Sequence, residues 1–386
     1  MQITAIRPMI VNAEMRNWIF VKVETDEGIT GWGEASLEWK TRGVVGCIED
    51  LAPFVIGLDP RRIEHLYQVM FRQPFFRAGV VGMSAISGIE QACWDIFGKS
   101  VGLPVYQLLG GAARDKIRMY DHLGGGEMQS LYMQDTADQM AERARESVAA
   151  GYTALKALVV PRSGPLEGHA AIARSARLME AIRTAVGDDI DLMVDFHGRT
   201  LPEMAVLYGE ALAPYRPYFI EEPCLPDSVD GLLHVSRSLS IPVASGERLV
   251  TRYQFRELLE KRAVAIIQPD LCHCGGLWEA RKIAAMAETY YISLAPHNPL
   301  GPIATVAAIH FALATPNFLI QEAIRADVPW RAHVVSSPLT ITDGYATLND
   351  APGLGVEVNE TEAAKHPFAQ EVLMRSFHDD ASVADW

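Results

Sequence analysis

Six ionisable side chains in the second half of the chain each stand where a short apolar run ends. The series Asp195, Glu221, Glu247, Asp270, His297 and Glu322 has successive separations of 26, 26, 23, 27 and 25 residues. One strand–helix unit of a closed barrel has about this length, and the active sites of such barrels lie at the carboxyl ends of the strands. A single acidic residue after a strand could be a helix cap, but six in phase predict a site.

The carboxylates of Asp195, Glu221 and Glu247 would meet as an anionic cluster of oxygen ligands. Such a cluster stays ionised only if a cation neutralises it. Oxygen ligands with room for water and substrate suit Mg²⁺ better than Zn²⁺, which predicts Mg²⁺ as the cofactor, one ion per subunit. The alternative is a structural ion network in which Lys156 and Arg248 neutralise the carboxylates.

Two histidines flank this predicted metal site. His197 comes two residues after Asp195, so alternation along a strand would place both side chains on the same side. His297 follows the seventh predicted strand, and Asp270 ends the sixth. A carboxylate beside an imidazole fixes its orientation and raises its basicity. The two histidines therefore predict acid/base chemistry beside the metal.

A barrel would bring these residues together. From about residue 116, short apolar runs alternate with amphipathic helices, and about eight such strands fit between residues 116 and 322. Alternating strands and helices form a parallel sheet, and eight strands favour a closed barrel. Within this pattern, Thr200 and Glu203 have the spacing of a capping box at the start of a helix from Pro202.

The first hundred residues have a different pattern, which predicts an α+β unit. Two β-rich runs, 18–25 and 29–34, are separated by a turn at 26–28 and predict a hairpin. Helical periodicity begins near Val44. A further helix is expected over 84–98, with Ser84 as its N-cap and Gly98 or Gly102 as its stop.

Composition restricts the possible partners. The chain has 34 Lys and Arg against 48 Asp and Glu, a formal net charge of −14, which argues against nucleic acid or an anionic membrane as partner. No apolar run approaches the ~20 residues of a spanning helix, and the N-terminus does not resemble a signal peptide. Five cysteines do not form a disulfide framework. We therefore expect a soluble, cytoplasmic protein.

Five motifs resemble the enolase superfamily, in its mandelate racemase subgroup and, within that, the dehydratases of galactonate-like acid sugars. They are VDFHGR at 194–199, FIEEP at 219–223, ASGER at 244–248, QPD at 268–270 and APHNPLGP at 295–302. Residues 84–111 are similar to the family's cap-domain helix and its junction with the barrel. The resemblance implies a (β/α)7β barrel over 116–335, an N-terminal α+β capping domain over 1–115, and a C-terminal segment, 336–386, that completes the cap.

The resemblance also implies roles for the site residues. Asp195, Glu221 and Glu247 match the Mg²⁺ ligands, Asp270 and His297 the catalytic dyad, His197 the dehydratases' additional histidine, and Glu322 the acid that contacts the substrate carboxylate, expected in its protonated form. Lys156 matches the first lysine of a Lys-x-Lys pair. Leu158 stands where racemases have the second lysine, which acts as a base, and this weakens a racemase or cycloisomerase interpretation.

Residues nearer the expected mouth of the barrel are weaker candidates. The loops that would close over the substrate contain Arg16, Trp18, Trp39 and Lys40, and His122 ends the first barrel strand. An ordinary surface or packing role is as plausible for each of them. The run Cys272-His273-Cys274 looks like a metal motif but is expected to pack, and Gly124-Gly125-Gly126 is expected in a rim loop.

The expected reaction is dehydration of a sugar acid to a 2-keto-3-deoxy acid through an enediolate. The expected partner is a small carboxylate substrate, and a homo-oligomer, from dimer to octamer, is expected. The alternatives are a racemase, epimerase or cycloisomerase on the same scaffold, a metal-dependent barrel hydrolase, or a non-enzymatic binding descendant of the fold.

Overall fold

Eight short parallel strands form a closed barrel in the computed structural model, which describes residues 1–77, 79–123, 136–324, 327–371, 375–378 and 380–385. Each strand pairs with the next along the chain, β11 pairs with β4, and a bridge from Leu294 to Phe318 completes the ring. The strands are β4 (Ile117–His122), β5 (Ala154–Ala157), β6 (Asp191–Asp195), β7 (Phe219–Glu221), β8 (Val243–Ser245), β9 (Ile266–Ile267), β10 (Ser293–Leu294) and β11 (Gln321–Ala323).

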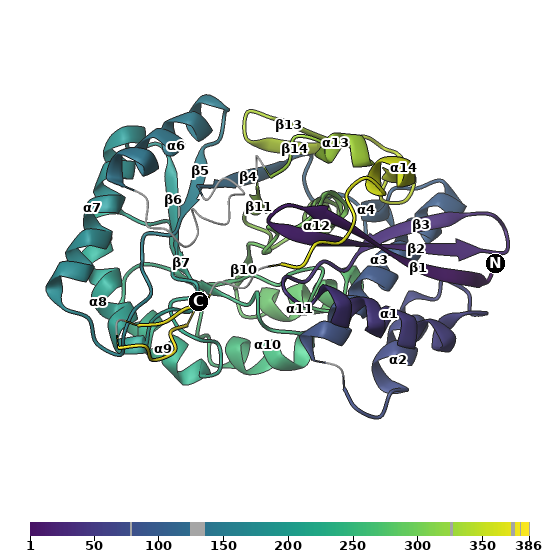
Figure 1. Ribbon diagram of the computed structural model, residues 1–386, viewed down its shortest axis with the longest axis horizontal. Coiled ribbons are helices and arrows are strands. Elements are labelled where there is room, and N and C mark those ends of the chain that lie inside the picture. The colour runs from purple at the N-terminus through teal and green to yellow at the C-terminus, as the bar shows by residue number, and fades with distance from the viewer. Residues whose placement is uncertain (78, 124–135, 325–326, 372–374, 379, 386) are drawn as a thin grey trace.

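Between the strands of the described barrel lie seven longer helices, so the predicted (β/α)7β arrangement is confirmed. They surround the strands as the outer layer in Figure 1. Their bounds are α6 (Ala137–Ala149), α7 (His169–Val186), α8 (Pro202–Leu212), α9 (Val229–Ser238), α10 (Thr251–Glu260), α11 (Leu277–Glu288) and α12 (Pro302–Ala314), with a short 3-10 turn, η1 (Ala213–Tyr215), after α8.

The start of α8 differs from the prediction. Pro202 occupies an early helical position as expected, but Leu201 is the N-cap residue and no side chain caps this helix. The Thr200 hydroxyl instead donates to the carbonyl of Pro223 in the loop after β7. The predicted capping box was therefore wrong, because the Thr200 side chain bonds to the Pro223 carbonyl, which is distant in sequence, instead of to the helix.

The N-terminal residues form a three-stranded antiparallel sheet covered by helices. The strands β2 (Arg16–Thr25) and β3 (Thr30–Glu34) are the predicted hairpin, and β1 (Ile3–Ala13) lies on the other side of β2. The helices are α1 (Thr41–Val55), α2 (Ile63–Arg72), α3 (Val80–Val101) and α4 (Val105–Leu108). Helix α3 lies so close to β3 that a Cβ on Gly33 would be 2.1 Å from the carbonyl oxygen of Gly88.

Helix α3 also begins earlier than predicted. It starts at Val80, so Ser84 lies inside it rather than at its N-cap, and the Ser84 hydroxyl donates to the Val80 carbonyl. Gly102 ends the helix in the left-handed region at φ 70°, as predicted.

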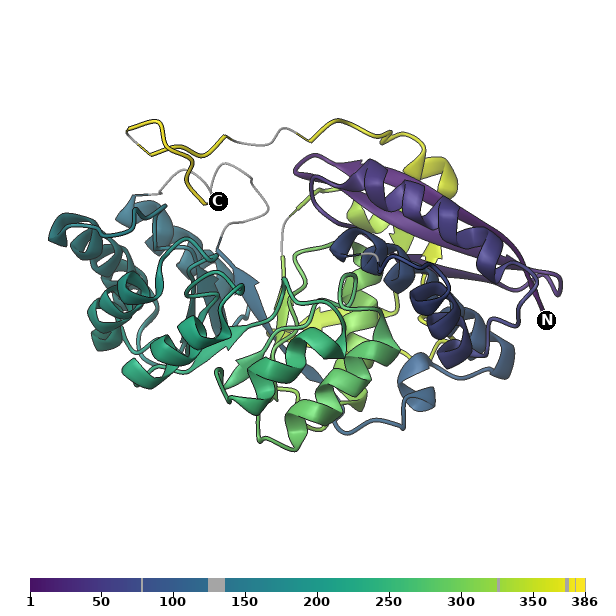
Figure 2. The ribbon, with the colours of Figure 1, turned by 90° about the horizontal axis from the view of Figure 1, so that it is seen from below.

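The C-terminal segment contacts both the barrel and the N-terminal unit. It comprises α13 (Arg331–Val334), β12 (Val335–Ser336), β13 (Leu339–Thr342), β14 (Tyr345–Leu348), β15 (Glu357–Val358) and α14 (Glu360–Ala363). Strand β14 pairs antiparallel with β4, whereas the carbonyl of His366 accepts from the Asn12 amide. The described residues beyond α14 then run from the N-terminal unit toward the side of helices α6 to α9 (Figure 2).

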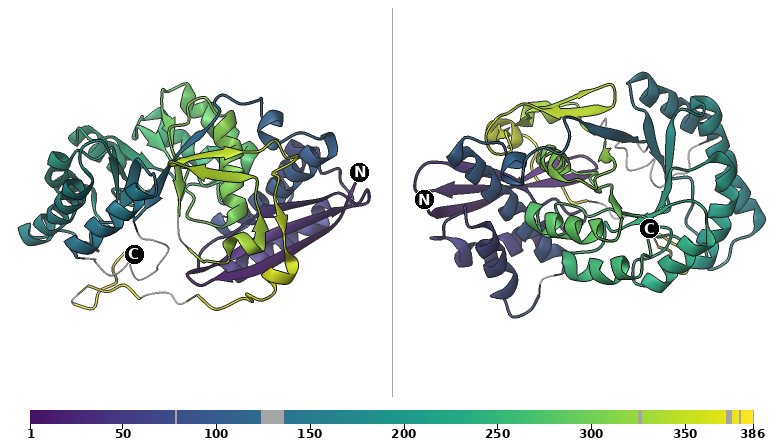
Figure 3. Two further views of the ribbon diagram at one scale, coloured as in Figure 1. Left: turned by 90° about the horizontal axis from the view of Figure 1, so that it is seen from above. Right: turned by 180° about the vertical axis from the view of Figure 1, so that it is seen from behind.

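Two buried glutamates join the N-terminal unit to the barrel. Glu34 of β3 accepts from the amides of Gly301 (2.8 Å) and Ala304 (2.9 Å) at the start of α12. Glu90 of α3 accepts from the amides of Leu277 (2.9 Å) and Trp278 (2.8 Å) at the start of α11. Each carboxylate thus satisfies free helix N-terminal amides and complements the helix dipole. The views in Figure 3 show the N-terminal sheet and helices seated against this side of the barrel.

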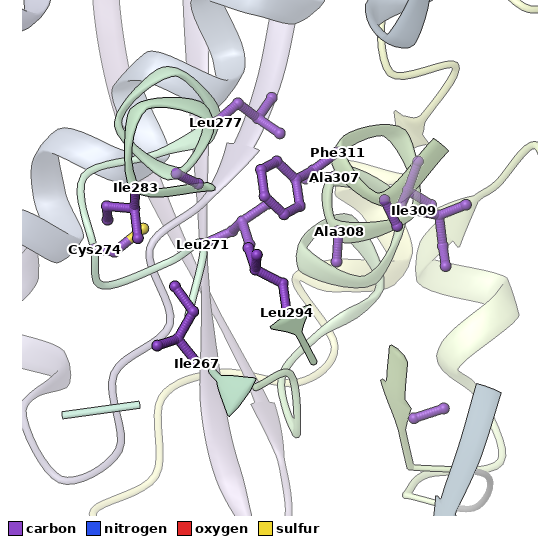
Figure 4. Close-up of a cluster of buried hydrophobic side chains, with 14 of the residues drawn as sticks. Ile267, Leu271, Cys274, Leu277, Ile283, Leu294, Ala307, Ala308, Ile309 and Phe311 are labelled. Atoms are coloured by element: carbon purple, nitrogen blue, oxygen red, sulfur yellow. The ribbon is translucent and has the colours of Figure 1, made fainter. Parts of the chain in front are cut away.

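Beneath this junction, apolar side chains from two barrel strands and two helices meet. Figure 4 shows Ile267 and Leu294 from the strands with Leu277 from α11 and Phe311 from α12, all of them buried. No helix in the described part of the chain is both long and apolar enough to cross a bilayer.

The first prediction concerns His310 of α12, which is fully buried. Its Nδ1 accepts from the Tyr106 amide and its Nε2 donates to the Leu354 carbonyl, both at 3.2 Å, so the neutral ring is fully bonded. Burial lowers the pKa of His310 to about 4. Because the unfolded chain takes up this proton near pH 6.5 and the folded chain does not, stability falls as pH drops from 6.5 toward 4.

Between pH 7 and pH 5, His310 should therefore lower the free energy of unfolding by about 2 kcal/mol. Urea titrations of wild type and His310→Gln measure this, and the variant should lack that part of the pH dependence. His234→Gln, on the exposed face of α9, serves as the control and should behave like wild type. An identical pH dependence in wild type and His310→Gln would contradict the prediction.

Candidate functional site

The carboxyl ends of the barrel strands open into a cavity of about 550 Å³ between the barrel and the N-terminal unit. Six of the residues singled out from the sequence lie in its barrel wall: His122, Lys156, Asp195, His197, Glu247 and His297. Glu322 also lines it, while Glu221 and Asp270 are buried directly behind these residues. The barrel thus brings together all the residues that end β6 to β11.

Lys156 is the centre of a buried ionic cluster. Its Nζ lies 2.6 Å from Glu221 Oε1, 2.7 Å from Glu322 Oε1 and 3.9 Å from Asp195 Oδ2. All four side chains are at most 5% exposed. The other oxygen of Glu221 accepts from Gln268 Nε2 at 2.7 Å. Parallel pairing of β6 with β7 sets Asp195 beside Glu221, and pairing of β4 with β5 sets Lys156 beside His122.

One ammonium does not neutralise this many carboxylates. Burial raises the pKa of Glu221 well above its usual range, and the neighbouring carboxylates add to this although Lys156 opposes them. Arg248, the other cation of the alternative ion network, lies 3.9 Å from Glu222 and 4.0 Å from Glu247. The network expected as the alternative therefore exists in part, but it leaves anionic charge uncompensated.

This excess charge fits a divalent cation. The donors available beside the cavity are carboxylate oxygens, which suit Mg²⁺. Among the described residues, no three His, Cys, Asp or Glu side chains lie close enough together to hold a metal ion. The Lys156 ammonium instead contacts Glu221. The donor set and its charge fit Mg²⁺, and the metal assignment stays a prediction.

His297 and Asp270 form the expected pair. His297 Nδ1 lies 2.8 Å from Asp270 Oδ2, and its Nε2 lies 3.6 Å from Glu247 Oε2. Burial alone would lower the pKa of His297, but Glu247, Asp270 and Glu322 outweigh it and raise this pKa to about 10. His297 lines the cavity and its Nδ1 is occupied by Asp270, so Nε2 is the nitrogen available to exchange a proton with a bound molecule.

His197 lines the cavity as predicted, but it lies in a turn after β6 and not in the strand itself. Strand β6 ends at Asp195, and His197 adopts the left-handed region at φ 55°. Its amide donates to Asp195 Oδ1 at 2.7 Å, and its carbonyl accepts from Arg248 Nη2 at 2.8 Å. Burial lowers the pKa of His197. The expected position is thus reached through a turn that Arg248 and Asp195 hold, and the reason given from the sequence was wrong.

Glu322 differs from the expected protonated acid. Burial raises its pKa, but contact with Lys156 and the charge of His297 outweigh burial and lower the pKa of Glu322 to about 2. Its second oxygen accepts from the Asn298 amide at 2.8 Å. In this structure Glu322 is therefore an ionised partner of Lys156. His122 lies on β4, beside Lys156 of β5. Burial and the charge of Lys156 lower the pKa of His122 to about 4, so its ring is neutral.

Three of the four candidates from the N-terminal loops line the cavity. Arg16, Trp39 and Lys40 do so, and Arg16 pairs with Glu38 at 2.6 Å. Trp18 does not: it is fully buried and packs edge-on against Trp330 at a ring distance of 5.5 Å. The expectation that Trp18 contacts substrate was wrong, because Trp330 and Arg331 of the C-terminal segment cover its ring and Trp18 does not line the cavity.

Sequence reasoning missed several residues of the cavity wall. Arg248 was considered only as a neutralising charge, and His273 only as packing, although His273 lies in the wall and 3.5 Å from Asp270. Its spacing of three residues from Asp270 was the available signal. Asp385 near the C-terminus also lines the cavity, and no local pattern indicates this. Cys272 and Cys274 are buried free thiols, as expected for packing, while Gly124-Gly125-Gly126 lies outside the described residues.

Comparisons with known proteins place both units of the chain. The N-terminal domain family of mandelate racemase and muconate lactonizing enzyme matches residues 4–110, and the enolase C-terminal domain-like family matches residues 139–362. A D-galactonate dehydratase from Ralstonia pickettii is 40% identical over 379 residues, and one from Pectobacterium atrosepticum is 38% identical over 379 residues. In both cases the match covers 96% of each chain.

Solved structures agree with these matches. A mandelate racemase/muconate lactonizing enzyme-like protein from Roseovarius sp. TM1035 is 36% identical with a TM-score of 0.89, and the match covers 100% of both chains. An enolase from Agrobacterium radiobacter, for which galactarate dehydration is the suggested activity, is 32% identical with a TM-score of 0.90 over 100% of both chains. Its crystal structure contains sodium and L-malate.

The second prediction concerns the charge balance at Lys156. Removing the ammonium by Lys156→Gln leaves buried carboxylates unpaired, so the free energy of unfolding without divalent cations should fall by about 3–5 kcal/mol. Added Mg²⁺ should restore more stability to this variant than to wild type, because the cation replaces the lost charge. Urea titrations in EDTA and in Mg²⁺ measure both effects.

Lys365→Gln provides the matched control, because Lys365 is exposed and pairs with Glu362 on the surface. It should change stability by about 1 kcal/mol or less. A Lys156→Gln variant as stable as this control in EDTA would show that the cluster needs no such compensation.

Proposed function

Since the chain belongs to the mandelate racemase/muconate lactonizing enzyme family of the enolase superfamily, we propose that it dehydrates a sugar acid to a 2-keto-3-deoxy acid through an enediolate. The family matches confirm the resemblance seen in the sequence, the fold class and the expectation of an enzyme. The observation that carries the proposed reaction is the pair of histidines, His197 and His297, in the wall of one cavity that also contains the carboxylate cluster.

His297 is the proposed base. His297 lines the cavity and donates from Nδ1 to Asp270, which leaves Nε2 to take the proton from C2 of the substrate. Abstraction needs a neutral ring, whereas the surrounding carboxylates favour the imidazolium. A cation among these carboxylates would lower their pull on the proton, which is one reason that the proposed mechanism requires a metal.

Asp195, Glu221 and Glu247 would hold Mg²⁺. When bound, the ion supplies positive charge where the two carboxylate oxygens of the substrate become an enediolate. The Lys156 ammonium, already between Glu221 and Glu322, adds a donor on the same side. Glu322 fixes that ammonium as an ion pair in the structure; its contact with the substrate carboxylate stays a prediction.

His197 is the proposed acid that protonates the departing 3-hydroxyl. The turn after β6 presents its ring to the cavity, and Arg248 holds its backbone from the neighbouring loop. His197 and His297 come from β6 and β10 rims, so a substrate bound between them would meet one on each side of the carbon chain. The two roles need different protonation states, which two separate histidines can supply.

Galactonate-like aldonates are the proposed substrates. The support is that both curated relatives described above are D-galactonate dehydratases aligned over nearly their whole length. Arg16, Trp39, Lys40 and His122 in the cavity wall are proposed to contact the sugar chain. A racemase or cycloisomerase has less support, because the half-buried Leu158 provides no base for the second face of the carbon. A homo-oligomer stays a prediction.

The third prediction tests the metal. Glu247→Gln removes one anionic ligand, so turnover should fall by at least about 10³-fold while the fold is kept, since carboxylate repulsion decreases. The measurement is 2-keto acid formation from a panel of C5 and C6 sugar acids with Mg²⁺, alongside circular dichroism. Exposed Glu257→Gln on α10 is the control. Full activity of the wild type in excess EDTA would refute the metal requirement.

The fourth prediction separates the two histidines. His297→Asn should stop both dehydration and exchange of the C2 hydrogen with solvent deuterium, because no base remains. His197→Asn should block loss of water but keep exchange, because the enediolate can still form and return. A substrate analogue with fluoride at C3, a leaving group that needs no proton, should recover part of the turnover of His197→Asn.

Mass spectrometry of recovered substrate in deuterium oxide measures the exchange. Hydrogen exchange at the wild-type rate in His297→Asn would contradict the assignment of His297 as the base. Dehydration at the wild-type rate in His197→Asn would contradict the assignment of His197 as the acid.

A further inference from the structure

Two segments of the N-terminal unit supply most of its share of the cavity wall. They are the turn between β1 and β2 (residues 14–17) and the loop between β3 and α1 (residues 35–40). The wall residues from the first are Met15 and Arg16, and those from the second are Leu37, Glu38, Trp39 and Lys40. The ion pair of Arg16 with Glu38 joins the two segments once.

Glu371 of the C-terminal segment joins them a second time. Its Oε1 accepts from the Asn17 amide at 3.1 Å, and its Oε2 accepts from the Trp39 amide at 2.9 Å. The Thr41 hydroxyl at the start of α1 also donates to Oε2, at 3.3 Å. Because β3 pairs with β2 only from Phe20 onward, Glu371 supplies an acceptor at Asn17, where β3 no longer runs beside β2.

Neighbouring contacts hold Glu371 in this place. The buried side chain of Asn17 donates to the Ala369 carbonyl at 2.8 Å and accepts from the Ala369 amide at 3.3 Å. The guanidinium of Arg42 lies 4.8 Å from the centre of the Phe368 ring. The C-terminal segment is thus docked on the β1–β2 end of the N-terminal unit, which it passes in Figure 2.

The bond to Trp39 supports a strained backbone. Trp39 adopts the left-handed region at φ 58°, which is costly for a bulky side chain and persists only where the surroundings enforce it. Glu371 is half-buried. Burial raises the pKa of Glu371, while the bonds from Asn17, Trp39 and Thr41 favour its ionised form. Each carboxylate oxygen thereby holds one of the two segments.

We propose that Glu371 is a positioning residue for substrate binding, acting through the backbone of Trp39 and anchored at Asn17. One carboxylate with an oxygen on each segment fixes their spacing, even where the segments shift together. That spacing sets where the side chains of Trp39 and Lys40 stand relative to Arg16. The role rests on the proposed function of these side chains as contacts to the sugar chain.

Glu371→Gln tests the role at nearly constant shape. Glutamine keeps one acceptor oxygen, and its NH2 group would face the amide of either Asn17 or Trp39, which cannot accept. We expect KM for the sugar acid to rise about tenfold, with kcat changed by less than about threefold, because the acid/base groups stand on the barrel. Glu360→Gln makes the same change at an exposed residue of α14 and should leave both constants unchanged.

A double-mutant cycle shows whether Glu371 acts through Trp39. Trp39→Ala removes the side chain that the bond positions, so Glu371→Gln should raise KM clearly less in this background than in wild type. A residue that only stabilises the fold would have the same effect in both backgrounds.

A further measurement needs no substrate. Hydrogen-exchange mass spectrometry should show faster exchange in Glu371→Gln for peptides that cover residues 15–18 or 37–41, because one of the two amides loses its acceptor. Peptides of α11 should exchange as in wild type, and Glu360→Gln should change none of these peptides. If wild type dehydrates no sugar acid, the proposed function fails, but the exchange still decides whether Glu371 holds the two segments.

Two results would overturn the inference. One is unchanged hydrogen exchange in both peptides of Glu371→Gln. The other is a rise in KM on adding Glu371→Gln to Trp39→Ala that equals the rise in wild type, which would show that the two residues act independently.

Discussion

The site depends on one electrostatic constraint: several carboxylates are buried around a single ammonium. Glu221, Glu322 and Asp195 surround Lys156, and closure of the barrel fixes them there because each stands at the end of its own strand. Desolvation penalises every one of these charges, and one lysine cannot offset them all. Burial of the large apolar core around the barrel offsets this desolvation free energy. The uncompensated negative charge gives the cluster a strong preference for a cation.

This constraint explains the division of labour among neighbouring residues. Groups that must stay charged in the cluster are bound to Lys156 or to backbone amides, as Glu322 is to the Asn298 amide. Groups that must carry or release protons lie at the edge of the cluster, where His297 meets Asp270 and His197 occupies a turn beyond β6.

Periodic features of the chain were predictable from the sequence, and features set by distant partners were not. The spacing from Asp195 to Glu322 predicts a barrel rim because each interval is one strand–helix unit, a local property. The burial of Trp18 depends on Trp330, and the bond of Thr200 to Pro223 depends on the next loop. The ionised state of Glu322 likewise depends on Lys156, which lies six strands away along the chain but only two strands away in the closed ring, on the other side of β4.

The bonds of Glu34 and Glu90 to the first amides of α12 and α11 restrict how the protein can move. Swinging the N-terminal unit away as a rigid body would strip both helices of these acceptors and leave the two carboxylates with only their donors inside that unit, Ser36 for Glu34 and Trp94 for Glu90. A hinge between the two units is therefore energetically disfavoured. Admission of a substrate must come from local rearrangement of segments at the cavity mouth, such as the loops around Arg16 and Trp39, while the α3 side of the junction stays closed.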